Sequence, residues 1–296
     1  MRIIKIGLIA FAALTLHLQS CQKKGPETNS GRYPILFDCS SYDTKAISTE
    51  QDLKDNGFVV RADYSLNGGE FNFLQDVKYN AENQVWAGTP TEYWWPGASY
   101  TFNAIYPKLS EQNLSFVDGG IQINNFDVKS QIDILAATVE CQVPSGNDAP
   151  KEGSVVKLDF KHLLALVVVE IKAEVRVTVN QVTLMMVPIK ANYAGGYWNT
   201  SSQGNIDKTI NMSFAVNESK DVTEGGFLVI PGMVNGYKLR VDTPDKDYDI
   251  TIPSINWVAG TKYTYKLTIK QNDIMFDEPS VEEWDEENAV GSVIIK

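Results

Sequence analysis

Short runs of alternating apolar residues are the feature that most constrains the fold of this chain. From residue 32 onward, stretches such as "EFNFLQDVKY", "YTFNAIY" and "KYTYKLTIK" place an apolar side chain at every second position. A strand with one buried face has this period, whereas a helix buries residues three or four apart. Gly, Asn, Asp and Pro separate the runs, as turns between strands require. The sequence therefore predicts an all-β chain.

One stretch, residues 142–154, shows no alternation and is rich in Pro, Gly, Ser and charged residues. This composition is typical of a linker. We therefore expect two β-sandwiches in tandem, an N-terminal one at 32–141 and a C-terminal one at 155–296. Sandwiches are favoured over parallel sheets because crossover helices are missing, and only residues 48–56 permit a short helix.

The beginning of the chain has the pattern of an export signal. Two basic residues precede an apolar run, Ile6 to Leu16, which is too short to span a bilayer comfortably. The run leads into "LHLQSC", which looks like the lipobox at which bacterial lipoprotein signals are cut. We therefore expect a signal peptide at 1–20 and acylation of Cys21, for example by palmitate. The alternative is an ordinary signal that is cut nearby and leaves Cys21 as a free thiol.

The segment that follows, residues 21–31, is polar, contains Gly and Pro, and predicts a flexible tether. Removal of 1–20 takes away two basic residues and leaves 24 basic and 37 acidic ones, a formal net charge of −13. So acidic a protein is an unsuitable partner for nucleic acid. The acyl chains of Cys21 would supply the affinity for a membrane.

His162 is the single histidine outside the signal peptide. It follows Phe160 and precedes Leu164 at strand spacing, so the three side chains share one face. Catalysis by histidine needs a nucleophile and an orienting acid, and zinc needs further histidine or cysteine ligands. Neither constellation is visible around this position. We therefore expect His162 to be a structural residue at the edge of a core.

Other candidate sites are weak. Asp245, Asp247 and Asp249 have the spacing of the first ligands of a calcium loop, but isoleucine and asparagine stand where that loop requires glycine and glutamate. A solvated strand face explains the same spacing. Cys39 and Cys141 are a pair that an exported chain could oxidise, although one pair in a chain of this length is no disulfide scaffold.

The most aromatic stretch is "TEYWWPGASY". Tyr93, Trp94 and Trp95 offer rings on which a sugar could stack, while the structural alternative is that they cap a sandwich core ahead of Pro96. The chain contains no glycine-rich phosphate loop, no G-x-S-x-G elbow and no H-E-x-x-H helix. The sequence thus favours a protein without catalytic activity, cofactor or metal site.

The order of several stretches carries a family resemblance. After the lipobox come "YPILFDC", "TKA", "EYWWPGASYTFNAIYP", "VKLDFKHLLALVVVEI", "GGFLVIPG", "WVAGTKYTYKLTI" and "IMFDEPSVEEW". The ordered set resembles the fimbrillin family of Bacteroidales type V pili, in its minor-fimbrillin-like branch. The resemblance implies two transthyretin-like β-sandwiches, a lipoprotein exported to the surface of the outer membrane, and assembly with other fimbrial subunits into a fibre or its tip. It also implies a structural role for the F-x-H strand.

The resemblance further implies that a protease specific for basic residues cuts after Lys45, ahead of Ala46, and that the first strand then leaves. Loss of this strand would open an apolar groove that a partner strand can fill by β-augmentation. The expected donor is the carboxyl-terminal run Val293, Ile294 and Ile295. The competing hypothesis is a surface lipoprotein that binds host or bacterial glycans through Tyr93 to Trp95 and never polymerises.

Overall fold

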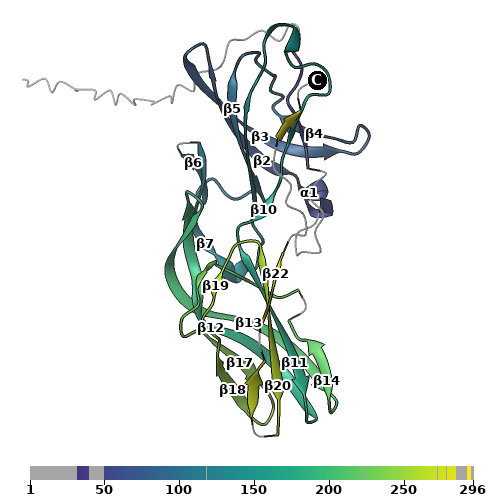
Figure 1. Ribbon diagram of the computed structural model, residues 1–296, viewed down its shortest axis with the longest axis vertical. Helices are drawn as coiled ribbons and strands as arrows, with labels where there is room; N and C mark the ends of the chain where they lie inside the picture. Colours follow the sequence, from purple (N-terminus) through teal and green to yellow (C-terminus); the bar gives the residue numbers. More distant parts are fainter. Residues whose placement is uncertain are drawn as a thin grey trace, which may run out of the picture.

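The computed structural model shows an elongated protein with two lobes stacked along its long axis (Figure 1). The all-β prediction is confirmed, because strands dominate both lobes. Among the described residues the only α-helix is the short α1 (Glu50–Asn56). Two short 3-10 turns, Val128–Ser130 and Gly146–Asp148, complete the elements. The structure describes residues 32–39, 50–117, 119–223, 225–271, 273–277, 279–284 and, for the backbone, 292–294.

The first lobe is built around one nine-stranded sheet with the order β10-β8-β5-β2-β3-β4-β1-β9-β23. Its central hairpin turns at Asn67 and Gly68, whose φ angles of 51° and 75° are those of the tight turn that matches strand twist. β23 contacts β8 as well as β9, so the sheet curls until strands from its two ends meet. The strands are β1 (Leu36–Asp38), β2 (Phe58–Leu66), β3 (Gly69–Asn80), β4 (Val85–Thr89), β5 (Ser99–Tyr106), β8 (Leu135–Gln142), β9 (Val155–Lys157), β10 (Lys161–His162) and β23 (Ser292–Ile294).

The second lobe contains two six-stranded sheets and one small ribbon. One sheet comprises β11 (Ala165–Ala173), β14 (Glu218–Asp221), β15 (Phe227–Val229), β20 (Thr261–Ile269), β21 (Ile274–Phe276) and β22 (Ser280–Glu283). The other comprises β6 (Leu114–Val117), β7 (Gly120–Asp127), β12 (Val177–Ala194), β13 (Tyr197–Phe214), β17 (Lys238–Asp242) and β18 (Asp247–Thr251). The ribbon pairs β16 (Gly232–Met233) with β19 (Asn256–Trp257).

The order of the strands in the chain does not follow the division predicted at 142–154. β6 and β7 precede that stretch but pair with β12 of the second lobe, whereas β9 and β10 follow it but pair within the first sheet. The chain therefore passes between the lobes more than once. Alternation of apolar residues reveals a strand but not the sheet it joins, which is why the sequence places the division differently.

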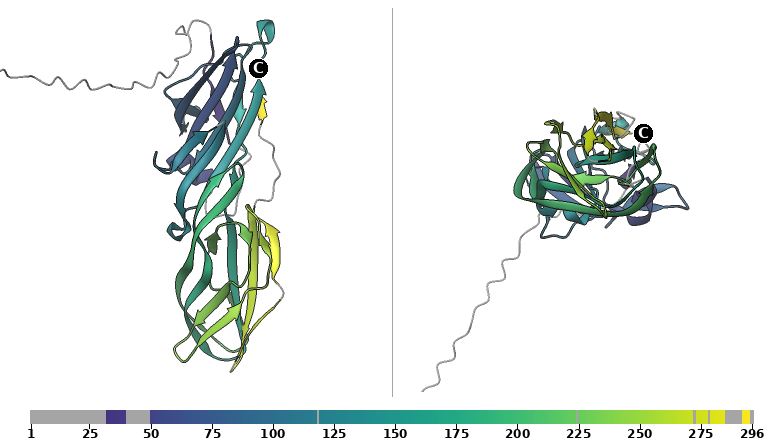
Figure 2. Two further views of the ribbon diagram at one scale, coloured as in Figure 1. Left: turned by 90° about the vertical axis from the view of Figure 1, so that its left-hand side faces the viewer. Right: turned by 90° about the horizontal axis from the view of Figure 1, so that it is seen from below.

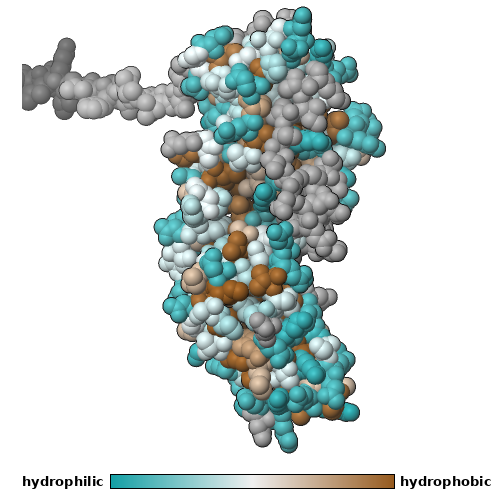
Figure 3. Space-filling view, in the orientation of Figure 1, coloured by the Kyte–Doolittle hydropathy of each residue, from teal (hydrophilic) through white to brown (hydrophobic). Residues whose placement is uncertain are grey.

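Each lobe has its own buried apolar cluster. The first cluster is rich in aromatic rings, and the second is dominated by valine, leucine and isoleucine from β11, β12 and β20. Apolar side chains also reach the surface near the small ribbon and β22, where Met233, Val258 and Val281 are each about half exposed or more (Figure 3). Within the described residues, no helix has the length and apolar character needed to cross a membrane.

Candidate functional site

β1 occupies a slot inside the first sheet. It pairs antiparallel with β4 on one side, with Phe37 opposite Trp86, and parallel with β9 on the other, with Phe37 opposite Val156. Only three residues long, it is nevertheless flanked by strands on both edges. Its removal would leave two sheet edges facing each other across an empty strand position.

The inward face of this segment is fully buried. Ile35, Phe37 and Cys39 are 1%, 2% and 1% exposed, as the alternating sequence requires. The Phe37 ring meets Phe58 and Phe102 edge to face, with ring centroids 6.3 and 6.2 Å apart. Burial of one large apolar side chain contributes about 1.5 to 3 kcal/mol, so this short strand is a substantial part of the first core.

The residues ahead of β1 lie along the aromatic segment. Pro34 forms a bridge with Tyr93, closed by hydrogen bonds from the Ile35 amide to the Glu92 carbonyl (2.8 Å) and from the Trp94 amide to the Tyr33 carbonyl (3.0 Å). The pairing that holds β1 therefore begins before the strand itself. Residues 33–39 and the aromatic segment are parts of one site.

A cation covers the outer side of this pairing. The guanidinium carbon of Arg32 lies 3.5 Å from the centroid of the Trp95 ring, a close cation–π contact. Partial burial raises the pKa of Glu92, and the nearby Arg32 acts against this rise. Arg32 thus stacks on the Trp95 indole and lies close enough to Glu92 to affect the pKa of its carboxyl group.

Tyr93, Trp94 and Trp95 do not form one flat exposed row. Trp94 is 1% exposed and meets Tyr100 and Phe102 edge to face inside the core, whereas its two neighbours are half-buried. Strand geometry explains the split, because successive side chains point to opposite faces. The middle ring is a core residue, and the outer two frame the segment that precedes β1.

Lys45 and Ala46 lie outside the described residues, in the stretch between Cys39 and α1. Of the expected donor residues, Val293 and Ile294 fall in β23, and Ile295 lies outside the described part. β23 pairs antiparallel with β9 of the same chain, with Val293 opposite Val156. Figure 2 shows this short yellow strand against the first lobe. Within one molecule, β9 therefore has β1 on one edge and the carboxyl-terminal strand on the other.

His162 belongs to a buried cluster between the lobes. Its Nδ1 lies 2.7 Å from the Asp133 Oδ2, and neither side chain has exposed surface. The imidazole is stacked on the Trp284 indole, with centroids 3.8 Å apart and planes 5° from parallel. Asp133 comes just before β8, and Trp284 just after β22. Strand spacing in the sequence singles out the histidine, but it does not indicate the aspartate.

The remaining predicted positions are not brought together. Asp249 makes a two-pronged ion pair with Arg240, at 2.7 and 2.9 Å, across the β17–β18 hairpin. Asp245 and Asp247 are exposed, and no group of three or more metal-ligating side chains occurs among the described residues. Cys39 and Cys141 do not form a disulfide with each other. Burial raises the pKa of Cys141 to about 11, so this thiol stays protonated at neutral pH.

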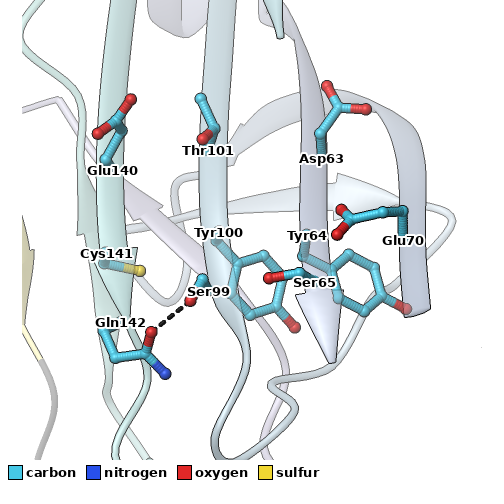
Figure 4. A pocket seen from close by; sticks show the side chains of 10 residues that line it. All are labelled: Asp63, Tyr64, Ser65, Glu70, Ser99, Tyr100, Thr101, Glu140, Cys141 and Gln142. Carbon is cyan, nitrogen blue, oxygen red and sulfur yellow. Dashed lines mark hydrogen bonds between the residues drawn. The ribbon is translucent and has the colours of Figure 1, made fainter. Parts of the chain in front are cut away.

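An open hollow lies on the first sheet, over β2, β3, β5 and β8 (Figure 4). It is polar, with Asp63, Glu70 and Glu140 near serine and threonine hydroxyls, and Ser99 donates a hydrogen bond to Gln142. Arg61 neutralises one carboxylate, with its Nη2 2.9 Å from Asp63 Oδ1. The hollow presents hydrogen-bonding groups without an activated nucleophile beside them.

Comparison with known proteins identifies the family. The model of the family described as "Fimbrillin-like" matches residues 44–284, which is most of the chain. The chain belongs to the fimbrillin-like family. β1 and β23 both lie outside the matched range of this fimbrillin-like protein. No curated protein matches its sequence.

Solved structures share the fold of this fimbrillin-like protein. A fimbrial protein from Bacteroides vulgatus aligns with a TM-score of 0.60 at 18% identity, covering 86% of this chain and 100% of the other. A candidate cell adhesion protein from Bacteroides ovatus gives 0.58 at 15% identity, covering 87% and 99%. One from Bacteroides uniformis gives 0.55 at 18% identity, covering 88% and 100%. At these identities the likeness concerns the fold.

Proposed function

We propose that this protein is a subunit of a cell-surface fimbrium, exported as an outer-membrane lipoprotein through Cys21 and assembled by strand exchange. Cleavage after Lys45 frees the segment that contains β1. The carboxyl-terminal strand of the next subunit then enters the slot between β4 and β9. The observation that carries this proposal is the position of β1, a three-residue strand enclosed by β4 and β9 and buried on its inward face.

Cleavage alone does not release the first strand; it makes the strand exchangeable. Ile35 and Phe37 bury large apolar surfaces, so the cut strand stays in place until another strand offers comparable burial. Before cleavage the strand binds intramolecularly at a high effective concentration, which an external competitor cannot match. Afterwards the exchange is between two separate segments, and an apolar donor such as Val293 to Ile295 competes on equal terms.

The pairing partner of β23 supports its assignment as donor. It pairs with β9 on the edge opposite the β1 slot, so the run already forms an antiparallel ladder with this strand. The same run can add to the slot edge of β9 in another copy by β-augmentation. Contact between the tail of one copy and the slot of the next is heterologous, so repetition produces a filament rather than a closed dimer.

Limited proteolysis of the purified mature protein tests the proposal. Beyond the tether, trypsin should cut first at Lys45 in the folded chain, and the cut form should polymerise or capture a peptide that ends in "SVIIK". Lys45→Gln should resist cutting and stay monomeric, while Lys151→Gln, in an exposed loop, should behave like the parent. The proposal is wrong if trypsin spares Lys45, or if the cut form neither assembles nor binds the peptide.

A further inference from the structure

The place that Arg32 occupies is a subsite for a cation. Its guanidinium lies on the Trp95 ring and close to the half-buried Glu92, just beyond the Pro34–Tyr93 bridge. In the proposed assembly, Arg32 leaves together with β1. An indole face and a carboxylate without its cation then remain at one end of the empty slot. A donor that fills the slot covers this carboxylate again, and a carboxylate buried without a partner is costly, so the site favours a donor that brings a new positive charge.

The donor tail carries one such charge. After Lys270, the sequence "QNDIMFDEPSVEEWDEENAVGSVIIK" contains a single basic side chain, Lys296, whereas acids are frequent ahead of residue 288. A donor that ran in the same direction as β1 would therefore bring its acidic part towards Glu92. A donor that ran in the opposite direction would bring Lys296 there. The second orientation is the one that brings a cation to Glu92, because the ammonium lies at the far end of the lysine side chain, several ångströms from the backbone carboxylate of the same residue; charge complementarity selects it on this ground.

The pairing of β23 has the same direction. It is antiparallel to β9, whereas β1 is parallel to β9, so β23 runs opposite to β1. Both strands use Val156 as a partner, which places Val293 on the level of Phe37 in the ladder. Continuing this register by three residues places Lys296 of a donor on the level of Pro34.

A donor lysine at the level of Pro34 can reach the place that Arg32 occupies. Residues 32 and 34 point to the same side of an extended chain and lie about 7 Å apart. A lysine side chain covers that span. In the same register Val293 and Ile295 fall on the inward levels of Phe37 and Ile35, so the apolar and the charged requirements are met together.

We propose that Lys296 of the incoming subunit replaces Arg32 on Trp95 and Glu92, which sets the donor strand antiparallel to the strand it displaces. This inference rests on the proposed strand exchange and adds the direction of the donor strand and a subsite for Lys296. The subsite fixes the register of the donor strand in the slot, because an apolar run of three residues could otherwise slip by two positions.

A synthetic donor tests the subsite. The probe is the N-acetylated peptide ENAVGSVIIK with a free carboxyl end, added to the full chain after cutting at Lys45. Replacement of its lysine by alanine should weaken binding about tenfold, and replacement by arginine should preserve it. Glu92→Gln should weaken binding of the lysine peptide but not of the alanine peptide. Glu140→Gln, an exposed carboxylate of the same sheet, is the matched control and should change neither.

Chemical cross-linking tests the direction of the donor strand separately. Because the peptide is acetylated, the lysine amine is its single amine, and a carbodiimide should join it to Glu92 as an amide found by mass spectrometry. Binding that does not depend on lysine, or a cross-link to a carboxylate at the other end of the slot, overturns the subsite and leaves strand exchange standing. A peptide that fails to bind the cut chain at all overturns both.

Discussion

The Nδ1 of His162 lies 2.7 Å from Oδ2 of Asp133, and both side chains are fully buried between the lobes. Removal of one member of such a pair leaves a buried polar or charged partner and typically costs 3 to 5 kcal/mol. The stacked Trp284 indole closes the other side of the imidazole, so water has no ready access to the vacated position.

We therefore expect His162→Gln to lower the free energy of unfolding by about 3 kcal/mol, and Asp133→Asn by a similar amount. The double variant should cost much less than the sum, because each single change already removes the interaction. Urea denaturation of the four proteins measures this. Lys161→Gln, at the exposed neighbouring position, is the control and should stay within about 0.5 kcal/mol of the parent. Strictly additive costs would show that the two residues do not act as a pair.

The His162 cluster also shows how far sequence reasoning reaches. Strand spacing of Phe160, His162 and Leu164 predicts an inward histidine, and the structure places it there. Its partner is 29 residues earlier, at the start of a strand that pairs with β10 only in the folded chain. A contact of this kind depends on non-local strand pairing, which a period of two does not encode. The same limit explains why the sequence pattern places β6 and β7 in the first lobe.

Local chemistry, in contrast, is readable from the sequence. The tight turn at Asn67 and Gly68, the short helix that buries Leu53 and the inward set of Ile35, Phe37 and Cys39 all follow from neighbouring residues. The position of Arg32 over Trp95 does not, because the two are 63 residues apart in the chain. The sequence indicates the aromatic segment as a candidate site, but it does not indicate Arg32 as the residue that covers it.

Phe37 should be the main determinant of how firmly β1 is held. Phe37→Ala should lower the free energy of unfolding by about 3 to 5 kcal/mol, because it opens a cavity among Phe58, Phe102 and Val156. In the chain cut at Lys45 it should also accelerate displacement of the strand by a donor peptide. Leu36→Ala, at the half-buried outward position, should have a smaller effect on both thermal unfolding and exchange. Equal effects of the two changes would contradict the assigned inward face.

Acylation of Cys21 predicts a membrane-bound protein. Cys21→Ala should leave a longer precursor and move the protein out of the membrane fraction, because the polar tether at 21–31 has no apolar surface to replace the acyl chains. Immunoblots of separated fractions measure both changes. Unchanged fractionation of the variant would show that the anchor lies elsewhere.

Cys141 should react slowly with alkylating agents in the folded protein. Burial raises its pKa from the ordinary value of 9.0 to about 11, and the thiolate is the reactive form. The rate of iodoacetamide labelling at residue 141 should therefore keep rising up to about pH 11. Since folding disfavours the thiolate, this group supports the folded state fully below pH 9 and loses that contribution as the pH rises through 11. Mass spectrometry of the labelled peptide separates Cys141 from the buried Cys39, and a labelling rate that levels off near pH 9 would contradict the burial.

A reversible lock on the first strand offers the sharpest test of strand exchange. The hydrogen bonds that flank Pro34 and Tyr93 make them a non-hydrogen-bonded antiparallel pair, the geometry in which opposite side chains come closest. Pro34→Cys with Tyr93→Cys, in a background of Cys39→Ala and Cys141→Ala, should therefore form a disulfide.

After cutting at Lys45, the oxidised protein should remain a monomer because its strand cannot leave. Reduction should restore assembly to the level of a sample that was never oxidised. The two states differ in one bond, so folding defects of the four substitutions affect both equally. Polymerisation of the oxidised, cut protein, followed by size-exclusion chromatography, would mean that assembly does not require departure of residues 33–39.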